Sequence, residues 1–566
     1  MEPLDNNPGL PQAGGTAPVS ADELNHRGIV LARQGRLDEA VADFQRAVQT
    51  EPENALAHDN LGLALILQGK LDEAIACCRR AVELKPDFAE AYSNLGRAWM
   101  GQGRIEEALA CFRRSLAVKP GFAEAHNRMG LALQSQGKRE QAAASFRAAL
   151  QSNPALAEAY LNLGNVLKEE GQLDEAAGCY RQALQLKPNY AEAHSNLGTA
   201  LGTQGRLDDA IACYRRALEL KPDHAASHYN LGTAYVERGM LDEAMACYHR
   251  ALEYKPDYAE AHWNQSLLWL LRGDFLRGFA QFEWRWKAKD GRPRNFSQAP
   301  WAGQPLDGKT ILLHAEQGLG DTMQFIRYAP LVKRVGARVL VECPKPLVRL
   351  LAGCRGVDEL IVWGDDLPPF DTHAPLLSLP RILHTVLETI PAEVPYLFPD
   401  AGLAERWRKE LGPIAGSKIG IVWRGNPKHQ NDLARSIPLS RFASLLSLPG
   451  VRFFSLQKGP GVEQLQDLDG QCHVTELGSR LDDFLDTAAV LVNLDLLITC
   501  DTAVAHLAGA LGVPAWVALP LVPDWRWLLD RDDSPWYPTM RLFRQKRPGD
   551  WPGVMEQIRT AWAART

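Results

Sequence analysis

The stretch AEAYLNLGNVLKEEGQLDEAAGCYRQALQLKPNY, residues 157–190, decides the fold of the first half of this 566-residue chain. Residues 191–224 repeat its pattern as AEAHSNLGTALGTQGRLDDAIACYRRALELKPDH. Self-similarity at a fixed period of 34 residues indicates stacked copies of one supersecondary unit, each too small to bury its own hydrophobic face. The first half of the chain is therefore predicted to be an α-helical solenoid.

Glycine and proline recur with this period, and each has a physical role. The first glycine of each unit lacks a side chain, so that two helices can pack closely, and the second ends the first helix in a left-handed conformation. Proline ends the second helix. The pattern resembles seven tetratricopeptide (TPR) repeats over residues 21–260. The three series are Gly28, Gly62, Gly96, Gly130, Gly164, Gly198 and Gly232; Gly35, Gly69, Gly103, Gly137, Gly171, Gly205, Gly239 and Gly273; and Pro52, Pro86, Pro120, Pro154, Pro188, Pro222 and Pro256.

An asparagine series occupies one position of the first helix and is interrupted only by Arg128. Two interpretations stay open, because a surface asparagine can bond within its own repeat or bind the backbone of an extended peptide through its donor and acceptor. The series resembles the asparagine ladder of eukaryotic O-GlcNAc transferases, which also carry TPRs ahead of a glycosyltransferase domain. Its members are Asn60, Asn94, Asn162, Asn196, Asn230 and Asn264.

The eighth unit, in the segment 261–306, departs from the pattern. It carries Phe275, Phe279 and Phe282, followed by two tryptophans. A terminal repeat cannot stack on another copy, so its outer face must differ. We expect a capping unit with a buried aromatic junction to the next domain, and then a proline-containing linker.

Composition limits the classes of partner. Apolar content of 46% and charged content of 23% are those of an ordinary soluble globular protein, and the net charge of −6 indicates neither nucleic acid nor an anionic membrane. Residues 1–20 lack the basic start and apolar run of a secretory signal, which predicts a disordered leader in a cytoplasmic protein. Five cysteines share one repeat position and are predicted to pack a helix rather than to form disulfides or bind zinc.

Beyond residue 308 the pattern changes to strands alternating with helices, which indicates parallel sheets. Two such runs, in segments 307–400 and 413–566, predict two Rossmann-like lobes with a ligand-binding cleft between them. The predicted fold class is thus α + α/β, a TPR solenoid followed by a two-lobed α/β region. The expected strands are 311–314, 338–342, 359–363, 418–423, 451–457, 496–499 and 515–519.

Two motifs at strand ends resemble the signatures of ADP-heptose:lipopolysaccharide heptosyltransferases, glycosyltransferase family 9. They are Gly318-Leu319-Gly320-Asp321 and Asp501-Thr502-Ala503-Val504-Ala505-His506-Leu507. The resemblance covers about residues 308–566. It implies the GT-B fold and inverting, metal-independent transfer from a nucleotide-diphosphate sugar, with no further cofactor.

In that family the aspartate after the glycine-rich turn is the general base, which maps to Asp321. A carboxylate at a strand end that faces a cleft can take the proton of an attacking hydroxyl. The alternative is that Asp321 only caps the following helix. Gly320 and Gln317 are candidate donor or acceptor contacts beside it.

The second motif maps to the donor side. The resemblance implies that Asp501 holds the donor sugar, while Thr502 and the free N–H groups near Ala503 bind its diphosphate at a helix N-terminus. His506, one turn along the helix, is expected near the phosphates. The alternative for His506 is a half-buried helix histidine.

Further cations and aromatics are candidates for the same site. Arg435 and Ser436 stand where heptosyltransferases have a phosphate-binding lysine, and an arginine can bind phosphate bidentately; a solvated surface charge is the alternative. Arg424 and Asn426 follow a strand at the predicted cleft edge. Trp525 and Arg526 could stack on a sugar or pair with phosphate, or could pack the C-terminal helix against the first lobe.

The chain departs from its relatives in two respects. The first lobe is short, and the O-GlcNAc transferase pattern His-Pro-x-x-x-His is missing, so neither a lipid-sugar acceptor nor a particular donor follows. The solenoid points to a protein or peptide acceptor, hence to protein O-glycosylation. Two alternatives remain: glycan or lipopolysaccharide assembly, and a non-enzymatic TPR scaffold with a degenerate transferase domain.

Overall fold

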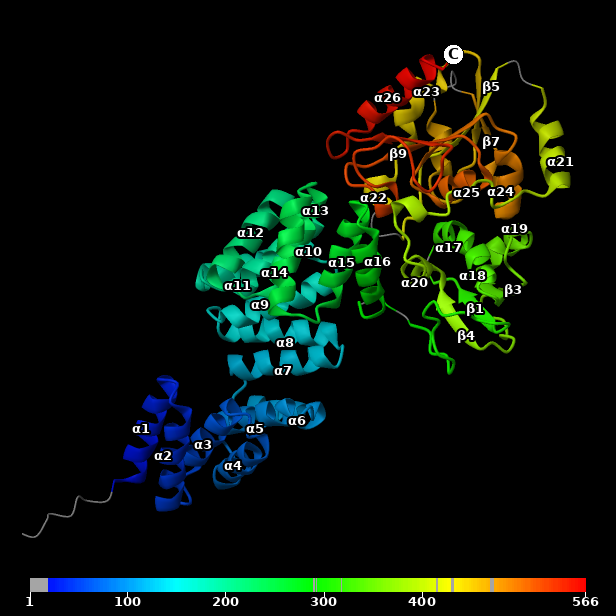
Figure 1. Cartoon of the computed structure of the whole chain (residues 1–566). Coiled ribbons are helices and arrows are strands. Elements are labelled where there is room, and N and C mark those ends of the chain that lie inside the picture. Colours follow the sequence, from blue (N-terminus) through cyan, green and yellow to red (C-terminus); the bar gives the residue numbers. More distant parts are fainter. Residues whose placement is uncertain are drawn as a thin grey trace, which may run out of the picture. The chain divides into compact units, whose positions relative to one another are not determined.

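A computed structural model describes residues 19–288, 291, 293–316, 318–413, 416–428, 432–468 and 473–565. The chain divides into two compact units, Met1–Asp223 and His224–Thr566. Figure 1 shows their helices and strands in chain order by colour. Residues 1–18 of the expected leader, and Gln317, lie outside the described residues. Within the described ranges, no helix has both the length and the apolar character needed to cross a membrane.

The first unit is built from six helical hairpins, which confirms the predicted repeats. In each hairpin a 13-residue helix precedes a 14-residue helix, and the first helices of adjacent repeats also contact one another. The helices are α1 (Ala21–Arg33), α2 (Leu37–Thr50), α3 (Ala55–Leu67), α4 (Leu71–Leu84), α5 (Ala89–Gly101), α6 (Ile105–Val118), α7 (Ala123–Ser135), α8 (Arg139–Ser152), α9 (Ala157–Glu169), α10 (Leu173–Leu186), α11 (Ala191–Thr203) and α12 (Leu207–Leu220).

The two glycine series have the roles expected of them. A Cβ atom on Gly164 would lie 2.6 Å from Cε1 of Tyr180, so only glycine lets α9 approach α10 this closely. The glycines between the helices, from Gly35 to Gly273, all have positive φ, from 72° to 82°. Only glycine adopts this conformation without a steric penalty, and it reverses the chain into the second helix.

The second unit begins with two more hairpins, so its boundary lies upstream of the segment in which a capping repeat was expected. These are α13 (Ala225–Glu237) with α14 (Leu241–Tyr254), and α15 (Ala259–Leu271) with α16 (Phe275–Phe282), followed by the 3-10 turn η1 (Glu283–Trp286). The side chains of Phe275, Phe279 and Phe282 are at most 3% exposed. All three rings lie within 6.4 Å of the Trp525 ring, which forms the expected aromatic junction.

The first lobe contains a four-stranded parallel sheet in the order β3-β2-β1-β4. Its strands are β1 (Thr310–His314), β2 (Arg338–Cys343), β3 (Glu359–Val362) and β4 (Thr372–Pro375). Its helices are α17 (Leu319–Phe325), α18 (Ala329–Arg334), α19 (Val348–Leu351) and α20 (Leu379–Ile382), with the turns η2 (Ile326–Tyr328), η3 (Lys345–Leu347), η4 (Leu376–Ser378) and η5 (Leu387–Thr389).

The second lobe contains a six-stranded parallel sheet in the order β10-β9-β8-β5-β6-β7. Its strands are β5 (Ser417–Val422), β6 (Val451–Ser455), β7 (Val474–Glu476), β8 (Leu496–Cys500), β9 (Ala515–Leu519) and β10 (Met540–Arg544). Its helices are α21 (Ala401–Leu411), α22 (Asp432–Arg435), α23 (Ala443–Leu446), α24 (Phe484–Leu491), α25 (Ala503–Leu511) and α26 (Trp551–Ala563), with the turns η6 (Leu439–Phe442), η7 (Val462–Asp467), η8 (Gly478–Arg480) and η9 (Trp525–Trp527).

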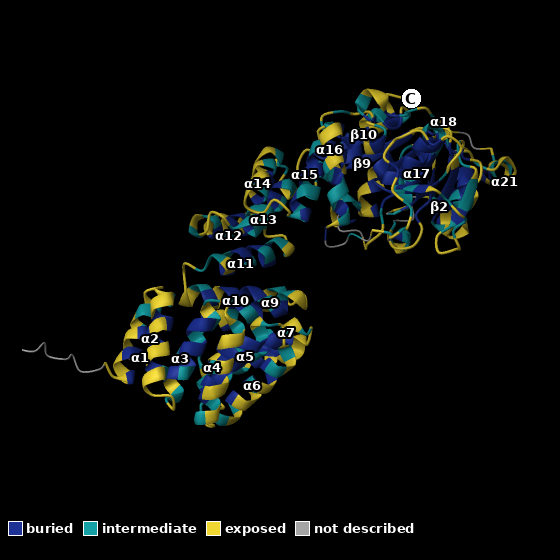
Figure 2. Cartoon of the chain, turned by 60° about the horizontal axis from the view of Figure 1, so that its bottom comes forward, coloured by how far each residue is buried: buried dark blue, intermediate teal, exposed yellow. Residues whose placement is uncertain are grey.

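The central strands of both sheets are mostly buried, as expected of strands covered on both faces, whereas β3, β4 and β7 are partly exposed (Figure 2). The apolar side of α26, including Val554 and Ile558, packs into the same core as Ile419 of β5 and Leu496 of β8. The C-terminal helix therefore covers the second lobe, and the alternative that placed it against the first lobe is wrong. The predicted α/β region with parallel sheets is confirmed.

Candidate functional site

The strand order of the second lobe defines where a ligand would bind. Numbered within the lobe, the order is 3-2-1-4-5-6, and the topological switch point lies between β5 and β8. In open α/β sheets, ligands bind outside the carboxyl ends of the strands at such a point. Here β5 is followed by Trp423 and Arg424, and β8 by Asp501 and Thr502, so that both predicted donor segments meet at the switch point.

The glycine-rich corner of the first lobe meets this edge directly. A Cβ atom on Gly320 would lie 2.8 Å from Cδ2 of His506 and 3.4 Å from Cα of Ala503, so the start of α17 is in contact with the start of α25. An open cleft was expected between these two points, but the two helix starts are packed against each other. Leu319, Asp321, Ala503 and Val504 remain partly exposed, whereas residues 322–325 of α17 and 505–511 of α25 are buried.

Two contacts of Asp321 bear on the two interpretations of its role. Its Oδ2 accepts a hydrogen bond of 3.0 Å from the backbone N–H of Gly318, which is the helix-capping contact. Its Oδ1 lies 2.5 Å from a guanidinium nitrogen of Arg526. The side chain is 17% exposed, so the carboxylate keeps some access to solvent beside its cation.

Arg526 is tied to three protein groups instead of standing free for a phosphate. Besides Asp321, it donates to Oε1 of Gln324 at 2.7 Å and to Oδ1 of Asp524 at 2.8 Å. Trp525 is 4% exposed and packs in the aromatic junction, against the rings of the eighth repeat and also near Trp536 at 6.0 Å. The contact with a sugar or base expected for Trp525 is therefore replaced by packing.

The eighth repeat also holds the first lobe next to the glycine-rich corner. Arg285 of η1 is 4% exposed, and its guanidinium makes two bonds of 2.9 Å to the carboxylate of Glu316, two residues before Gly318. It also donates to Oγ of Ser378 at 2.8 Å. Through Arg285 and the phenylalanines of α16, this one repeat contacts both lobes beside the candidate site.

Electrostatics around the start of α25 are shaped by burial. Burial and the charge of Asp524 raise the pKa of Asp501, whereas Arg435 and Arg526 oppose this rise. Burial and the nearby Arg526 lower the pKa of His506 to about 3, so its ring is neutral at physiological pH. Its Nδ1 lies 3.0 Å from the Tyr537 hydroxyl, and its ring stacks on Trp527. His506 is therefore a buried, neutral helix histidine, 5% exposed.

Thr502 and Ala503 differ in what they offer a ligand. The Thr502 hydroxyl lies 3.1 Å from that of Thr499 and is buried, so it is already engaged. Ala503 is partly exposed, and the first N–H groups of a helix point outward without intrahelical partners. With nine residues, α25 also carries the partial positive charge that favours an anion at this end.

Arg435 lies over the segment that leaves β5. A Cβ atom on Gly425 would be 2.7 Å from a terminal nitrogen of the Arg435 guanidinium, so the guanidinium lies directly against this corner. The Arg435 side chain is 15% exposed and stands 3.7 Å from Asp432, which is too long for a close pair. The alternative of a fully solvated surface charge therefore does not describe Arg435.

The neighbouring candidates have mainly structural contacts. Ser436 donates to Asp432 at 3.0 Å and accepts from the Gly425 N–H at 3.2 Å. Arg424 lies 3.7 Å from Asp432. Asn426 is exposed and accepts from the Lys428 N–H. Of this group, Arg435 is therefore the strongest candidate for an anion contact.

The structure adds residues that sequence reasoning did not find. Asp524, Gln324 and Tyr537 contact Arg526 or His506. Asp524 and Tyr537 stand in the aromatic and charged segments 523–527 and 533–538 of the sequence, whereas Gln324 stands in neither. His314, at the carboxyl end of β1, is 2% exposed, and neither ring nitrogen has a partner among the described residues. Burial lowers its pKa to about 3. A lone histidine in a strand carries no sequence signal that would separate it from a core residue.

The asparagine series bridges adjacent repeats. The side-chain amide of Asn60 donates to Asn25, that of Asn94 to Asp59, and that of Asn162 to Asn127, each 35 residues back in the chain. Asn196 donates to Asn165, and Asn264 to the Tyr229 hydroxyl. Asn230 also has a partner. The interpretation of a bond within the asparagine's own repeat is therefore wrong for these residues, because each bond reaches the preceding repeat. Peptide binding stays a prediction.

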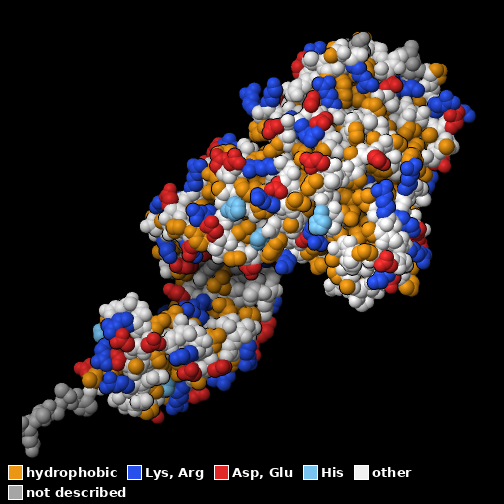
Figure 3. Space-filling model, viewed as in Figure 1, with side chains coloured by type: hydrophobic (Ala, Val, Ile, Leu, Met, Phe, Trp, Pro, Cys, Tyr) orange, Lys and Arg blue, Asp and Glu red, His pale blue; other side chains and the backbone are white. Residues whose placement is uncertain are grey.

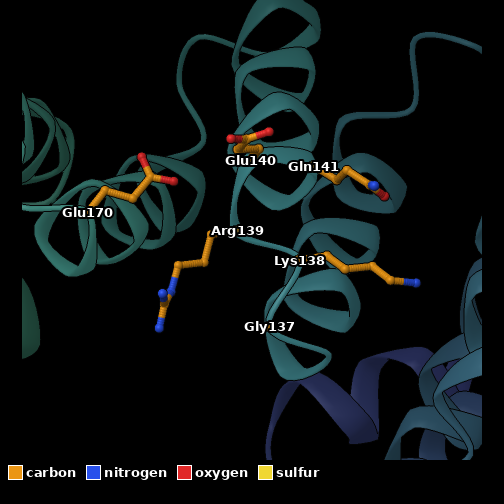
Figure 4. Close-up of a pocket in the computed structure, with 6 residues that line it drawn as sticks. All are labelled: Gly137, Lys138, Arg139, Glu140, Gln141 and Glu170. Atoms are coloured by element: carbon orange, nitrogen blue, oxygen red, sulfur yellow. The ribbon is translucent and has the colours of Figure 1, made fainter.

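A surface hollow of about 390 Å³ lies at the turn between α7 and α8 (Figure 4). Its lining consists of exposed residues from that turn together with Glu170. One of them, Arg139, pairs with Glu169 at 3.1 Å. The hollow has no buried reactive group and lies in the first unit, whereas the site described above belongs to the second.

Comparisons with known proteins identify the repeats. Models described as tetratricopeptide repeat match residues 26–89, 65–130 and 123–156, and a model described as TPR repeat matches 164–205, 203–239 and 232–265. The chain thus contains TPR repeats over most of its first 265 residues.

Among curated proteins, Protein FlbA of Caulobacter vibrioides (strain ATCC 19089 / CIP 103742 / CB 15) is 27% identical over 288 residues. The match covers 46% of this chain and 47% of FlbA, so the chain spans about half the length of that relative. Among solved structures, the APC/C hetero-tetramer Cut9–Hcn1 matches at 20% identity and a TM-score of 0.40, over 48% of this chain and 54% of that one. A thermophilic TPR protein of Thermus thermophilus matches at 26% identity and a TM-score of 0.30, over 32% and 99%.

Proposed function

We propose that the chain is an inverting, metal-independent GT-B glycosyltransferase that uses a nucleotide-diphosphate sugar and recruits a protein acceptor through its repeats. TPR repeats imply a protein-interaction scaffold, which supports the recruiting role. One observation carries the catalytic part. The Gly320–Asp321 corner of one parallel α/β lobe contacts the start of α25 at the topological switch point of the other lobe.

The chemistry follows from the residues at this contact. The N-terminus of α25 and the Arg435 guanidinium would hold the donor diphosphate, because backbone N–H groups and arginine both favour phosphate oxygens. The Asp321 carboxylate would take the proton of the acceptor hydroxyl as its oxygen attacks the anomeric carbon. The bond from that carbon to the diphosphate breaks, and the nucleoside diphosphate leaves. For this step, Arg526 must release Oδ1 of Asp321.

The same ion pair favours a second candidate, a non-enzymatic scaffold with a degenerate transferase domain. Asp321 is held 2.5 Å from Arg526, and Gly320 packs against His506, so that no open cleft separates the two motifs. An aspartate that is permanently paired is a poor general base, because the neighbouring cation stabilises its ionised form.

Donor binding separates the two candidates. We expect calorimetry with ADP, UDP, GDP and dTDP to detect binding of at least one diphosphate to the full chain. Arg435→Gln should weaken the affinity for this diphosphate at least about tenfold, because it removes roughly one hydrogen bond to a charged group. Arg441→Gln is the matched control, because Arg441 is exposed and follows the same segment. Absence of binding for all four diphosphates at millimolar concentration would overturn the enzymatic proposal and leave the scaffold.

Transfer is tested separately from binding. Asp321→Asn keeps the side-chain shape and should reduce sugar transfer to protein, or donor hydrolysis, about 100-fold or more, as expected for loss of a general base. Its affinity for the nucleoside diphosphate should stay within about threefold. Equal rates in both proteins contradict the role of Asp321, and transfer only to glycans or lipopolysaccharide would favour glycan assembly over protein glycosylation.

A further inference from the structure

The asparagine series is interrupted at Arg128 of α7, and this exception coincides with two further cations. Arg128 donates from Nη1 to Oγ of Ser93 on α5, at 2.7 Å, across the repeat boundary. Arg97 lies one helical turn beyond Ser93 on α5, so it shares that face. On the next first helix, α9, Lys168 lies one turn beyond Asn165, whose side-chain oxygen accepts from Asn196 of α11.

These three residues form what we name the cationic face, Arg97, Arg128 and Lys168, on the first helices of three successive repeats. All three side chains are half-buried. Burial lowers the pKa of each, and the charge of Arg97 lowers that of Arg128 further. The face thus concentrates positive charge on partly desolvated side chains.

No carboxylate within the described residues forms a salt bridge with any of the three. Some arginines at the start of the second helices or on them do pair with an acid three residues further along the chain, namely Arg36, Arg104, Arg206, Arg216 and Arg250. The exposed Arg113, Arg147 and Arg181 of the second helices form no salt bridge among the described residues. On the face of the molecule visible in Figure 3, positive and negative side chains are interspersed. Glu124 and Asp59 raise the pKa of Arg128, and Glu169 and Glu192 raise that of Lys168, but burial outweighs these acids and the pKa of both cations stays lowered. A carboxylate in direct contact would offset the cost of this burial.

We propose that the cationic face of repeats three to five binds an acidic segment of a partner protein, laid along the first helices. The two arginines supply forked donors that match carboxylate oxygens, and Lys168 supplies a third positive charge. Asn94 and Asn162 occupy the same helix position as Arg128. Their side-chain oxygens would accept hydrogen bonds from the backbone N–H groups of the bound segment. This inference rests on the recruiting role in the proposed function and does not depend on transfer chemistry.

Acids near the face select a peptide over a nucleic acid. Glu90, Glu124 and Glu158 occupy the second position of the three helices, and the whole chain is negatively charged. A uniformly charged polyanion would meet this repulsion along its length, whereas a peptide with a few carboxylates can place them on the cations and neutral residues beside the glutamates.

Other repeats of this chain carry neutral residues at the positions of the three cations, and these residues serve as substitutions for the test. Arg97→Thr, Arg128→Asn and Lys168→Gln install residues that stand at the same repeat positions as Thr199, Asn94 and Gln134. The triple variant therefore removes three charges with side chains that other repeats already accommodate. Arg113→Gln, Arg147→Gln and Arg181→Gln, on the outer helices of the same three repeats, form a control with an equal change of charge and exposed side chains.

The measurement is fluorescence anisotropy of the full chain with labelled peptides of about 12 residues. One peptide alternates Glu with Ser, a second has Gln for Glu and a third has Lys for Glu, and an oligothymidylate of similar length represents nucleic acid. We expect binding of the acidic peptide only, weakened at least about tenfold in the triple variant and less than about twofold in the outer control. High salt should reduce the difference between wild type and variant, because exposed charge pairs are screened.

Several results would overturn the inference. They are an equal loss of affinity in the outer control, equal binding of the Gln peptide, and tighter binding of the oligothymidylate. If circular dichroism shows that the triple variant is unfolded, the affinities of the wild type for the Glu, Gln and Lys peptides still test the inference. Failure of this binding would leave donor binding by the second unit untouched, because the two are measured with different ligands.

Discussion

At the scale of single residues, two glycines of the fifth repeat lie in opposite environments. A Cβ atom on Gly164 would meet Tyr180 at 2.6 Å, whereas one on Gly178 of α10 would meet no atom within 4 Å. Gly164→Ala should destabilise the first unit by about 1–3 kcal/mol through overpacking. Gly178→Ala should stabilise it by about 0.5–1 kcal/mol, the helix preference of alanine over glycine. Thermal unfolding of the two variants checks both signs, and equal shifts would contradict the packing role of Gly164.

Asp59, a residue of the inner helices, makes stability depend on pH. Burial raises its pKa to about 6, although the hydrogen bond from Asn94 opposes this. The folded state therefore binds a proton more tightly than the unfolded state, whose pKa is near 4, so stability falls as the pH rises from about 4 to about 6. Asp59→Asn should remove this loss, because Asn25 and Asn127 occupy the same repeat position.

The expected gain for Asp59→Asn is about 1–3 kcal/mol at pH 8 and close to zero at pH 4, from a shift of roughly two pKa units. Denaturant unfolding at both pH values is the measurement. A gain of the same size at pH 4 would show that the substitution acts through packing and not through ionisation.

At the scale of elements, α16 joins the repeats to the α/β region. Phe279 is 2% exposed and lies 5.5 Å from the Trp525 ring, whereas Leu276 of the same helix is 57% exposed. Phe279→Ala should destabilise the second unit by about 3–5 kcal/mol, and Leu276→Ala should change it by less than about 0.5 kcal/mol. Comparable effects of the two substitutions in thermal unfolding would argue against a buried junction.

The same element predicts where the chain can be divided. A fragment of residues 307–566 loses the phenylalanines that cover Trp525 and leaves Glu316 buried without Arg285, whose removal costs about 3–5 kcal/mol by itself. A fragment of residues 224–566 keeps both contacts. We expect only the longer fragment to be monomeric by size-exclusion chromatography, with near-ultraviolet circular dichroism of packed tryptophans. A well-folded shorter fragment would contradict this.

At the scale of the whole molecule, the two compact units carry the two proposed binding functions separately. Ligand binding stabilises only the unit that binds, by about 2.7 kcal/mol at a ligand concentration 100 times the Kd. Calorimetric unfolding should therefore show two transitions. A nucleoside diphosphate should raise only the transition of the second unit, and the acidic peptide only that of the first. A single transition that both ligands shift would mean that the units unfold together.

Much of the fold could be predicted from the sequence, because local patterns carry it. The 34-residue period, the two glycine series and the eighth-repeat phenylalanines each state a local requirement that the structure satisfies. Seven of the ten strands in the described part of the chain were expected, because each contains a run of apolar residues. The strands β4, β7 and β10 were missed, because they are short or interrupted by polar residues, and only pairing with neighbouring strands makes them strands.

The sequence by itself determined the TPR repeats, the alternating α/β pattern and the two motifs at strand ends, since periodicity and turn chemistry act over a few residues. Only the tertiary structure decided that Arg526 pairs with Asp321, 205 residues away, and that Trp525 packs under the eighth repeat. It also decided that the asparagines bridge repeats and that Arg97, Arg128 and Lys168 are half-buried without a direct salt bridge among the described residues. The physical reason is that ion pairing and burial depend on which side chains the folded chain brings together, and residue spacing alone does not state this.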